Sequence, residues 1–337
     1  MKGKRTKNLV LVMASLLLAV CIGVSSAMAA SEIIVAYFPG WPGTFEVGWA
    51  KEMFEKEMGV KIKWREFDTG AQMTAAMASG DVAISYAIGS IPFTSAVTQG
   101  MPLKMVAISE SYSEAENLVV RGDRGIAKPQ DLVGKKVATP FGTTSHYRLM
   151  GILQMFGIKE NQLQIIDMPG AEIVAAFRRG DIDAGCAWEP AVSEMIKFGG
   201  KAIVTAQDQI KAGYATYGLV AVTDAFAKQE PEKVRNFIKV MNWSTDFFRK
   251  NPDEAYKLIG QKAGLTPEKT KDIMASMGFY DRDEQLAQTW LGTTSKRGDV
   301  VKNLKQVADF LVKQQAIKKA LDSYEKFVDP SFMEAAK

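Results

Sequence analysis

The chain has 337 residues, with 42 Lys and Arg against 38 Asp and Glu and a single histidine. Four of the basic residues and none of the acidic ones lie within residues 1–29, so the rest of the chain carries 38 charges of each sign. This balance, with no basic tract, argues against nucleic acid or an anionic membrane surface as a partner. No segment after residue 29 has eighteen uninterrupted apolar residues, and we expect a soluble protein.

The first 29 residues have the pattern of a secretory signal peptide. A basic start over residues 2–7 precedes an apolar stretch over residues 9–24, and an Ala-x-Ala ending closes at Ala29. We predict cleavage after Ala29 and export to the periplasm. Lipidation at Cys21 is the alternative, but the branched Val20 stands before it where such sites have a small residue.

The exported part begins with alternating strand and helix patterns. Apolar runs predict strands, and apolar residues at helical spacing predict the helices between them. In chain order, we expect a strand at 33–36, a loop at 37–43, a helix around 50–54, a strand at 60–64, a break at 68–70, a helix at 73–77 with Gly80-Asp81 at its end, and a strand at 82–84 that leads to Gly89-Ser90.

The same order of elements recurs about a hundred residues later. Gly70 corresponds to Gly170, and Gly80-Asp81 corresponds to Gly180-Asp181. A Gly-Asp pair is a common helix stop, which explains each copy but not the shared spacing. The second copy has a strand at 137–138, a helix at 145–156, a strand at 163–166, a helix around 173–177, and a strand at 182–184 that leads to Trp188.

The repeat predicts an α/β fold with two lobes of similar build. The apolar runs at 118–120 and 219–222 are suited to strands that cross between the lobes. We therefore expect a first lobe of residues 30–121 plus 219–337 and a second lobe of residues 122–218.

Residues 138–149 read as a strand end, a tight loop and a helix start. Pro140 and Gly142 stop the apolar run, and the hydroxyl residues 143–145 follow. Such a junction directs unpaired backbone N–H groups and the positive end of a helix dipole at one point, which suits an anion. The alternative, which the residues leave open, is that Thr144 or Ser145 simply caps the helix.

Ligands of open α/β sheets bind at the C-terminal ends of the strands, where five loops of this chain would converge if the lobes face each other. Aromatic residues near these loops would wall a small ligand, with Trp188 foremost, although each of them alone can equally belong to a core. Glu46 and Glu189 lie near the same loops and can hold an ammonium group, although an exposed charge is the simpler explanation of each. The residues expected at the cleft are Tyr37, Trp41, Gly70, Ala71, Gln72, Gly89, Ser90, Thr143, Thr144, Ser145, His146, Trp188, Glu189 and Tyr217.

Catalysis and cofactor binding have little support in the sequence. His146 is the only histidine, which excludes histidine-rich metal sites and Ser-His-Asp or Cys-His schemes unless it acts alone. Cys186 is the only cysteine after residue 29, so no intrachain disulfide can form. The chain has no glycine-rich nucleotide motif. We expect no cofactor, no metal and no enzymatic activity.

Five stretches resemble the substrate-binding proteins of taurine and aliphatic-sulfonate ABC importers. The Gly-Asp motifs are shared widely among binders of this kind, whereas the hydroxyl run before His-Tyr is more specific to the taurine branch. The matching stretches are WREFDTGA at 64–71, ASGDV at 78–82, PFGTTSHY at 140–147, RGDID at 179–183 and WEPA at 188–191.

The resemblance implies a type II-like two-lobe periplasmic binding protein that closes on its ligand. Such a protein is monomeric, takes a small sulfonate such as taurine and presents it to a membrane permease. The resemblance also implies that Gly89-Ser90 and residues 143–146 hold the sulfonate while Trp188 packs on the carbon chain.

One position departs from the resemblance. Relatives that bind taurine place an aspartate for the amine on the strand that returns from the second lobe, where this chain has Gly218. Either Glu189 or Glu46 substitutes, or the ligand lacks an amine. Two other functions remain open: an enzyme of the thiamine-pyrimidine synthase type that uses His146, and a receptor for another small organic anion such as a carboxylate.

Overall fold

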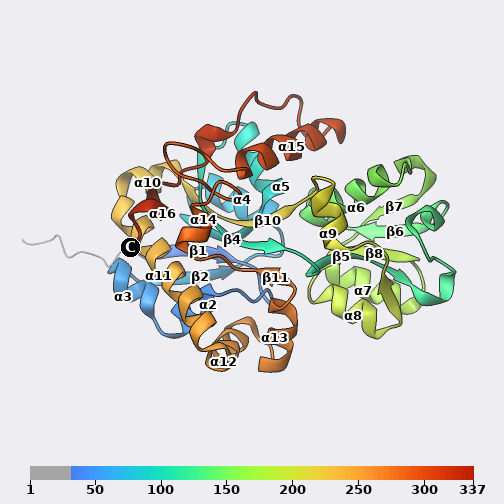
Figure 1. Cartoon of the computed structure of the whole chain (residues 1–337), viewed down its shortest axis with the longest axis horizontal. Helices are drawn as coiled ribbons and strands as arrows, with labels where there is room; N and C mark the ends of the chain where they lie inside the picture. The colour runs from blue at the N-terminus through green and yellow to red at the C-terminus, as the bar shows by residue number, and fades with distance from the viewer. Residues whose placement is uncertain (1–31) are drawn as a thin grey trace, which may run out of the picture. The chain divides into compact units, whose positions relative to one another are not determined.

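The computed structural model describes residues 32–337, which contain two β-sheets flanked by helices (Figure 1). The expected signal peptide and its cleavage site lie outside the described residues. Within residues 32–337, no helix has both the length and the apolar character needed to cross a bilayer. We call the part built around the larger sheet lobe 1 and the part built around the smaller sheet lobe 2.

The sheet of lobe 1 has six strands, which are β1 (Ile33–Tyr37), β2 (Ile62–Glu66), β3 (Ile84–Gly89), β4 (Leu103–Tyr112), β10 (Thr216–Thr223) and β11 (Met277–Gly278). Their order across the sheet is β11-β4-β10-β3-β1-β2. Strand β1 is parallel to β2 and β3, whereas β10 is antiparallel to β3 and β4. Strands β1 and β3 are buried nearly throughout, as expected of parallel strands covered by helices on both faces.

The sheet of lobe 2 has five strands, which are β5 (Glu116–Arg121), β6 (Lys136–Thr139), β7 (Gln164–Asp167), β8 (Ala184–Trp188) and β9 (Gly200–Ala202). Their order is β7-β6-β8-β5-β9. Strand β6 lies between β7 and β8 and is parallel to both, as β1 is in the larger sheet. Strand β5 is antiparallel to β8.

The internal repeat is present in the backbone hydrogen bonds as well as in the strand order. Gly80 and Gly180 end their helices in the left-handed region, with φ values of 84° and 81°. The N–H of Asp81 donates to the carbonyl of Ala76 at 3.1 Å, and the N–H of Asp181 donates to the carbonyl of Ala176 at 3.0 Å. The predicted two-lobe α/β fold is therefore confirmed.

Helices of lobe 1 come from both ends of the described chain (Figure 1). The helix expected around residues 50–54 is divided in two, because Glu52 adopts a left-handed conformation with φ of 54° between α2 and α3. The helices of this lobe are α2 (Phe45–Ala50), α3 (Met53–Met58), α4 (Gly70–Ala78), α5 (Ser90–Thr98), α10 (Asp224–Gln229), α11 (Pro231–Lys250), α12 (Pro252–Ala263), α13 (Pro267–Met274), α14 (Arg282–Gln285), α15 (Val300–Lys313), α16 (Ser331–Ala335) and the short 3₁₀ helix η4 (Glu325–Phe327).

Helices of lobe 2 cover both faces of its sheet, and each face has its own apolar cluster. Ile152 of α6 lies in the cluster on one face, and Phe177 of α7 lies in the cluster on the other. The helices of this lobe are α6 (Thr144–Met155), α7 (Gly170–Arg179), α8 (Ala191–Lys197), α9 (Ala206–Lys211), and the 3₁₀ helices η1 (Gly122–Arg124), η2 (Pro129–Leu132) and η3 (Glu160–Gln162).

The chain passes between the sheets at two places. The first passage lies between Tyr112, where β4 ends, and Glu116, where β5 begins. Residues 118–120, which we expected to cross between the lobes, instead lie inside β5 and pair with β8. A strand buried within one sheet and a strand that crosses between lobes are both apolar runs in the sequence. The sequence pattern therefore could not tell them apart, and the predicted position of this passage was several residues too late. The return passage ends at Thr216, close to the expected residue 219.

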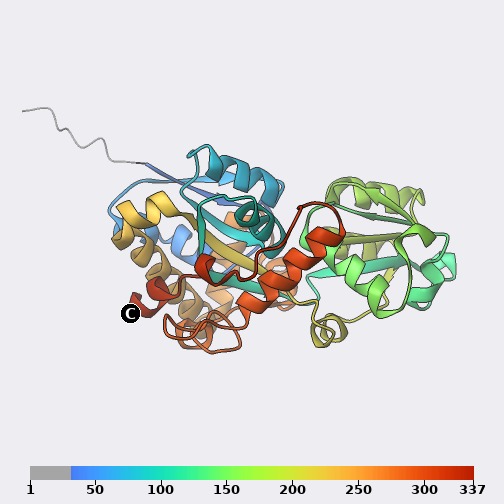
Figure 2. The same ribbon diagram turned by 90° about the horizontal axis from the view of Figure 1, so that it is seen from above.

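Helix α15 provides a further contact between the two lobes. It packs along α5 in lobe 1, and Figure 2 shows it, in orange-red, extending toward lobe 2. The Phe310 ring near its end lies 4.9 Å from the Tyr147 ring and 5.8 Å from the His146 ring, both on α6. Just beyond the helix, the Gln314 amide donates to Glu160 at 2.8 Å.

Candidate functional site

A cavity of about 40 Å³ lies where the C-terminal ends of strands from both sheets meet. Each of the five loops that we expected to converge, at 37–41, 69–72, 89–90, 141–146 and 188–189, contributes at least one residue. Six of the predicted residues line the cavity, namely Trp41, Gly70, Gly89, Thr143, Thr144 and Trp188. The other residues that line it are Phe38, Pro92, Tyr112 and Glu116.

Two helix N-termini face each other at this cavity, α5 from lobe 1 and α6 from lobe 2. Gly89 precedes α5 and Thr144 begins α6, and a Cβ atom built on Gly89 would lie 3.1 Å from Cγ2 of Thr144. The first N–H groups of any α-helix lack partners within the helix and carry its positive partial charge. The arrangement therefore concentrates N–H donors from two helices on one small volume.

The cap of α6 is Thr143, not Thr144 or Ser145. The Thr143 Oγ1 accepts from the N–H of His146 at 3.3 Å and donates to the carbonyl of Pro140 at 2.6 Å. On α5, the Ser90 hydroxyl is fully buried and has no hydrogen-bond partner within the described residues. Ser90 is not among the residues that line the cavity, but it keeps a free donor at the start of its helix, whereas Thr143 does not.

The hydroxyls of Thr144 and Ser145 both donate to the carboxylate of Glu116. The distances from Oε1 are 2.5 Å to Thr144 and 2.8 Å to Ser145. We expected these hydroxyls to donate to a bound anion, but here both protons are given to Glu116. What α6 offers at the cavity is its backbone N–H groups.

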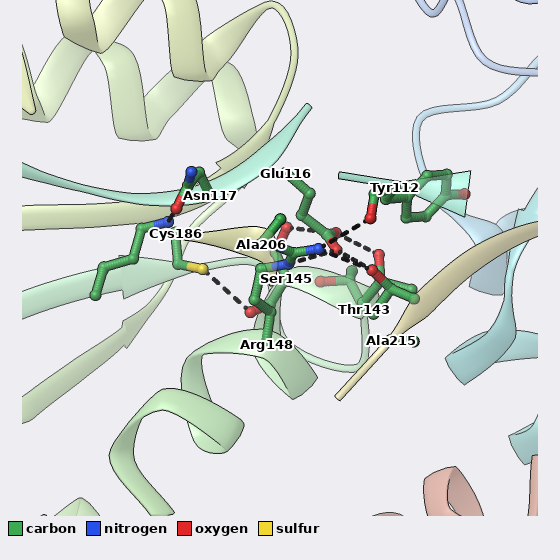
Figure 3. A network of polar contacts seen from close by, with 12 residues as sticks. Tyr112, Glu116, Asn117, Thr143, Ser145, Arg148, Cys186, Ala206 and Ala215 are labelled. Carbon is green, nitrogen blue, oxygen red and sulfur yellow. Dashed lines mark hydrogen bonds and ion pairs between the residues drawn. The ribbon is translucent and has the colours of Figure 1, made fainter. Parts of the chain in front are cut away.

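Glu116 is paired with Arg148 in a polar network that does not reach solvent (Figure 3). Nε of Arg148 lies 3.3 Å from Oε2 of Glu116, and its Nη2 donates to the Tyr112 carbonyl at 3.3 Å and to Thr216 Oγ1 at 3.2 Å. Thr216 in turn donates to Glu116 at 3.0 Å. Because Tyr112 and Glu116 bound the first passage between the sheets and Thr216 ends the second, the network fixes the start of α6 to both.

Aromatic side chains form the walls of the cavity. The Trp41 ring meets the Tyr112 ring edge to face, with centroids 5.3 Å apart, and both residues belong to lobe 1. Trp188 stands on the lobe 2 side at the end of β8 and is partly exposed, as is Phe38. Phe38, Thr143 and Trp188 also line a larger hollow of about 860 Å³ beside the cavity. The cavity is therefore apolar along its sides and rich in N–H donors at the helix ends.

Two buried acids lie behind the aromatic wall of lobe 1. Glu110 on β4 accepts from Nε1 of Trp41 at 3.1 Å, and burial raises its pKa to about 7. Glu46 on α2 accepts from the N–H of Gly43 at 2.6 Å, and burial raises its pKa well above the ordinary value. The expectation that Glu46 is more simply an exposed charge is therefore wrong, since its exposed fraction is 1%.

Three predicted residues are engaged away from the cavity. The Tyr37 hydroxyl donates to Glu66 at 2.8 Å, and its ring packs edge to face on Trp49. Tyr217 packs edge to face on Trp290, with ring centroids 5.9 Å apart. Glu189 accepts from the Ser193 hydroxyl at 2.6 Å at the start of α8 and lines the larger hollow beside the cavity. Its exposed fraction is 7%, so the expectation that it is more simply an exposed charge is wrong. Their ligand-binding roles stay predictions.

Three further predicted residues serve local structure. The Gln72 side chain accepts from the N–H of Thr69 and completes a capping box at α4. Ala71 lies on α4, beside Gly70, and lines a different hollow. The His146 ring stacks on Phe141 at 4.5 Å, and its Nδ1 accepts from the N–H of Gly142 at 3.4 Å.

Four residues that line the cavity were not predicted from the sequence, namely Phe38, Pro92, Tyr112 and Glu116. Tyr112 and Glu116 lie beside the first passage between the sheets, which the sequence placed several residues later. A correct placement of that passage would have brought both to the cleft. Pro92 sits in the first turn of α5, and a Cβ atom on Gly70 would collide with its ring, so these two residues pack together at the cavity.

The only histidine and the only described cysteine are both buried and lie off the cavity lining. Burial lowers the pKa of His146, so the imidazole is biased toward its neutral form. Burial also raises the pKa of the Cys186 thiol, which donates to the carbonyl of Ser145 at 3.3 Å. Among residues 32–337, no group of three His, Cys, Asp or Glu side chains is arranged to hold a metal ion.

Known proteins resemble this chain over most of its length. It is 31% identical over 295 residues to the taurine-binding periplasmic protein of Escherichia coli (strain K12), covering 86% of this chain and 89% of the relative. It is 29% identical over 297 residues to a putative aliphatic sulfonates-binding protein of Bacillus subtilis (strain 168), covering 86% of this chain and 82% of the relative.

The fold also matches solved structures. The crystal structure of the periplasmic aliphatic sulphonate binding protein of Escherichia coli aligns with a TM-score of 0.73 and 20% identity, covering 90% of this chain and 99% of that chain. This likeness shows that the two chains share the two-lobe architecture. A family model described as NMT1/THI5 like matches residues 48–255, and the chain therefore belongs to the NMT1/THI5-like family.

Proposed function

We propose that this protein is the periplasmic solute-binding component of an ABC importer and that it binds taurine or a related small aliphatic sulfonate between its lobes. The observation that carries the proposal is the pair of helix N-termini, α5 and α6, that face each other across the cavity. The names of the relatives support the same ligand class and the periplasmic location.

The donor arrangement suits a sulfonate better than a carboxylate. A sulfonate spreads one negative charge over three oxygens in a pyramid, which can accept from N–H groups on two sides. A carboxylate offers two oxygens in a plane. No Lys or Arg side chain lines the cavity within residues 32–337, so the anion would be held by backbone dipoles and by the Ser90 hydroxyl.

The aromatic walls suit a short carbon chain. Trp188, Trp41 and Phe38 offer apolar surface beside the helix ends, and ligand pockets typically combine such walls with a few polar groups. The cavity volume of about 40 Å³ has room for only a few water molecules. The cavity adjoins the hollow of about 860 Å³, with which it shares Phe38, Thr143 and Trp188. We expect these walls to move when a sulfonate enters, as in lobes that open and close around a ligand.

Delivery to a membrane permease follows from the proposed role. The receptor would act as a monomer and release its ligand unchanged. An enzyme of the same fold is the alternative. Recovery of a chemically altered ligand after incubation with the protein would favour that alternative over transport.

The test is ligand binding by residues 30–337, purified without the signal peptide and refolded to remove any ligand from the host cell. Taurine, isethionate and ethanesulfonate are compared with β-alanine and propionate by thermal shift and titration calorimetry. We expect saturable binding of at least one sulfonate at one site per chain. Binding of the carboxylates but of no sulfonate would refute the proposal.

A further inference from the structure

Gly218 leaves a space in the sheet of lobe 1 that the side chain of Glu110 fills. The two residues are direct partners on neighbouring antiparallel strands, β10 and β4. A Cβ atom built on Gly218 would overlap the Glu110 carboxylate. The backbone of Gly218 lies outside the left-handed region, so its conformation does not require glycine. The absence of a side chain at residue 218 is therefore what makes room for Glu110.

Glu110 does not line the cavity itself, but it lies on the face of the sheet that carries the cavity, behind Trp41. Gly218 is paired on its other side with Gly89 of β3, so Glu110, Gly218 and Gly89 form one row across the sheet. Directly paired residues present their side chains on the same face. A Cβ atom on Gly89 would point at Thr144 across the cavity, so this face is the one that carries the site. Glu110 lies in that row on β4, two strands away from Gly89 on β3.

Glu110 has unused hydrogen-bonding capacity. Its Oε1 accepts from Trp41, which lines the cavity, whereas its Oε2 is fully buried and has no partner among the described residues. No ion pair with a Lys, Arg or His is formed by Glu110 within residues 32–337. A buried carboxylate without a counter-charge is costly, and a cationic ligand group would supply that charge together with a donor for Oε2.

The other acids near the cleft are already engaged. Glu116 is paired with Arg148 and accepts from three hydroxyls. Glu46 accepts from the N–H of Gly43, and Glu189 accepts from Ser193. Of these four carboxylates, only Glu110 has a buried oxygen without a partner in the described part of the chain.

We propose that Glu110 binds the ammonium group of the ligand, so that the protein selects aminosulfonates such as taurine over sulfonates that lack an amine. This inference rests on the proposed function, since it assigns the second end of the same ligand. The ammonium would donate to Oε2 of Glu110 beside the Trp41 and Tyr112 rings, whose faces also favour a cation. The sulfonate would lie at the α5 and α6 N-termini.

The experiment compares taurine with ethanesulfonate, which has the same carbon chain and sulfonate but no amine. For the wild-type protein we expect taurine to bind at least about tenfold more tightly, as one charge-assisted hydrogen bond would give. In the Glu110→Gln variant, taurine affinity should fall by about tenfold or more while ethanesulfonate affinity changes by less than about threefold. Glu46→Gln is the matched control, because it removes another buried acid and should leave the ratio of the two affinities unchanged.

A carboxylate exchange tests the geometry directly. Glu110→Gly combined with Gly218→Asp vacates the space and returns an acid from the neighbouring strand, and we expect it to restore most of the taurine preference. If the single variant fails to fold, this double variant and the wild-type affinity ratio still decide the question. Proton release adds a further measurement, since binding an ammonium to a carboxyl with a pKa near 7 should release protons at pH 7, whereas ethanesulfonate should release none.

The outcomes separate the two proposals. If the wild-type protein binds no sulfonate, the proposed function fails. If it binds taurine and ethanesulfonate equally, or if Glu46→Gln rather than Glu110→Gln abolishes the preference, the role of Glu110 is refuted and the sulfonate receptor stands.

Discussion

Arg148 and Glu116 form an ion pair in which the side chain of Arg148 is 0% exposed and that of Glu116 is 1% exposed. The pair lies between the start of α6 and the two passages that join the sheets. Two charges that leave water together lose hydration, and their attraction offsets that loss only while both are present. The pair is therefore a position where a single substitution has a large effect.

Arg148→Met should destabilise the protein by about 3–5 kcal/mol, because it leaves the Glu116 carboxylate buried without its cation. Urea unfolding of residues 30–337 measures this loss. The double variant Arg148→Met with Glu116→Gln removes both charges and should regain much of the stability. A single variant that loses less than about 1 kcal/mol would show that water or another group replaces the guanidinium.

Trp188→Ala should weaken sulfonate binding by about 10-fold to 100-fold, in line with about 1.5–3 kcal/mol for a buried aromatic side chain. The fold should persist, because Trp188 is partly exposed and stands at the end of β8. Calorimetry gives the affinity, and circular dichroism reports the fold. Phe198→Ala removes an exposed ring from lobe 2 and should not alter binding. Equal affinity in the Trp188 variant would place the cleft wall elsewhere.

Gly89→Ala should reduce sulfonate affinity by about tenfold with little change in stability. The added methyl group would stand 3.1 Å from the Thr144 side chain and so oppose the close approach of the α5 and α6 N-termini. Gly170→Ala is the control, because a methyl group there would meet only the Ala191 Cβ at 3.9 Å. Affinities from calorimetry, beside melting temperatures, distinguish the two variants, and an unchanged affinity in Gly89→Ala would contradict the close approach.

The stability of the free protein should depend on pH through Glu110. Burial raises its pKa from 4.5 to about 7, so between these values the folded protein holds a proton that the unfolded chain releases. This contribution to stability is therefore present below about pH 4.5 and is lost as the pH rises through 7. The groups that act on the same cluster are Glu46, Tyr86 and Tyr112.

The measurement is the free energy of unfolding of wild type and Glu110→Gln at pH 5 and pH 8. The wild type should lose stability relative to the variant between the two values. Part of the difference comes from Glu46, because the charge of Glu110 helps to raise the pKa of Glu46. A difference that is independent of pH would show that Glu110 titrates at its ordinary value.

The sequence was informative about the repeat because glycine geometry is local. Gly80 and Gly180 end helices in a conformation that few other residues adopt easily, and the strands around them follow from apolar runs. The loops at the strand ends could therefore be located from local patterns alone. Six of the predicted residues in or beside them line the cavity, namely Trp41, Gly70, Gly89, Thr143, Thr144 and Trp188.

What the sequence did not reveal depends on pairing between distant residues. The hydroxyls of Thr144 and Ser145 looked free because Glu116, which accepts from both, precedes them by 28 and 29 residues. Glu110 was not predicted as a site residue. Only its pairing with Gly218 on the neighbouring strand shows that its side chain fills the space beside that glycine. Side-chain partners across a sheet are set by strand order, and no local pattern carries that information.

Helix α15 holds the two lobes together through a contact that does not depend on any ligand. The Phe310 ring packs on Tyr147 and His146 of the opposite lobe, so separating the sheets would return part of that aromatic surface to water. Exposure of a full phenylalanine side chain is unfavourable by about 1.5–3 kcal/mol, which sets an upper limit for this ring. The unliganded receptor would thus favour arrangements of the lobes that keep this contact, and the apparent ligand affinity would depend on how often the contact breaks.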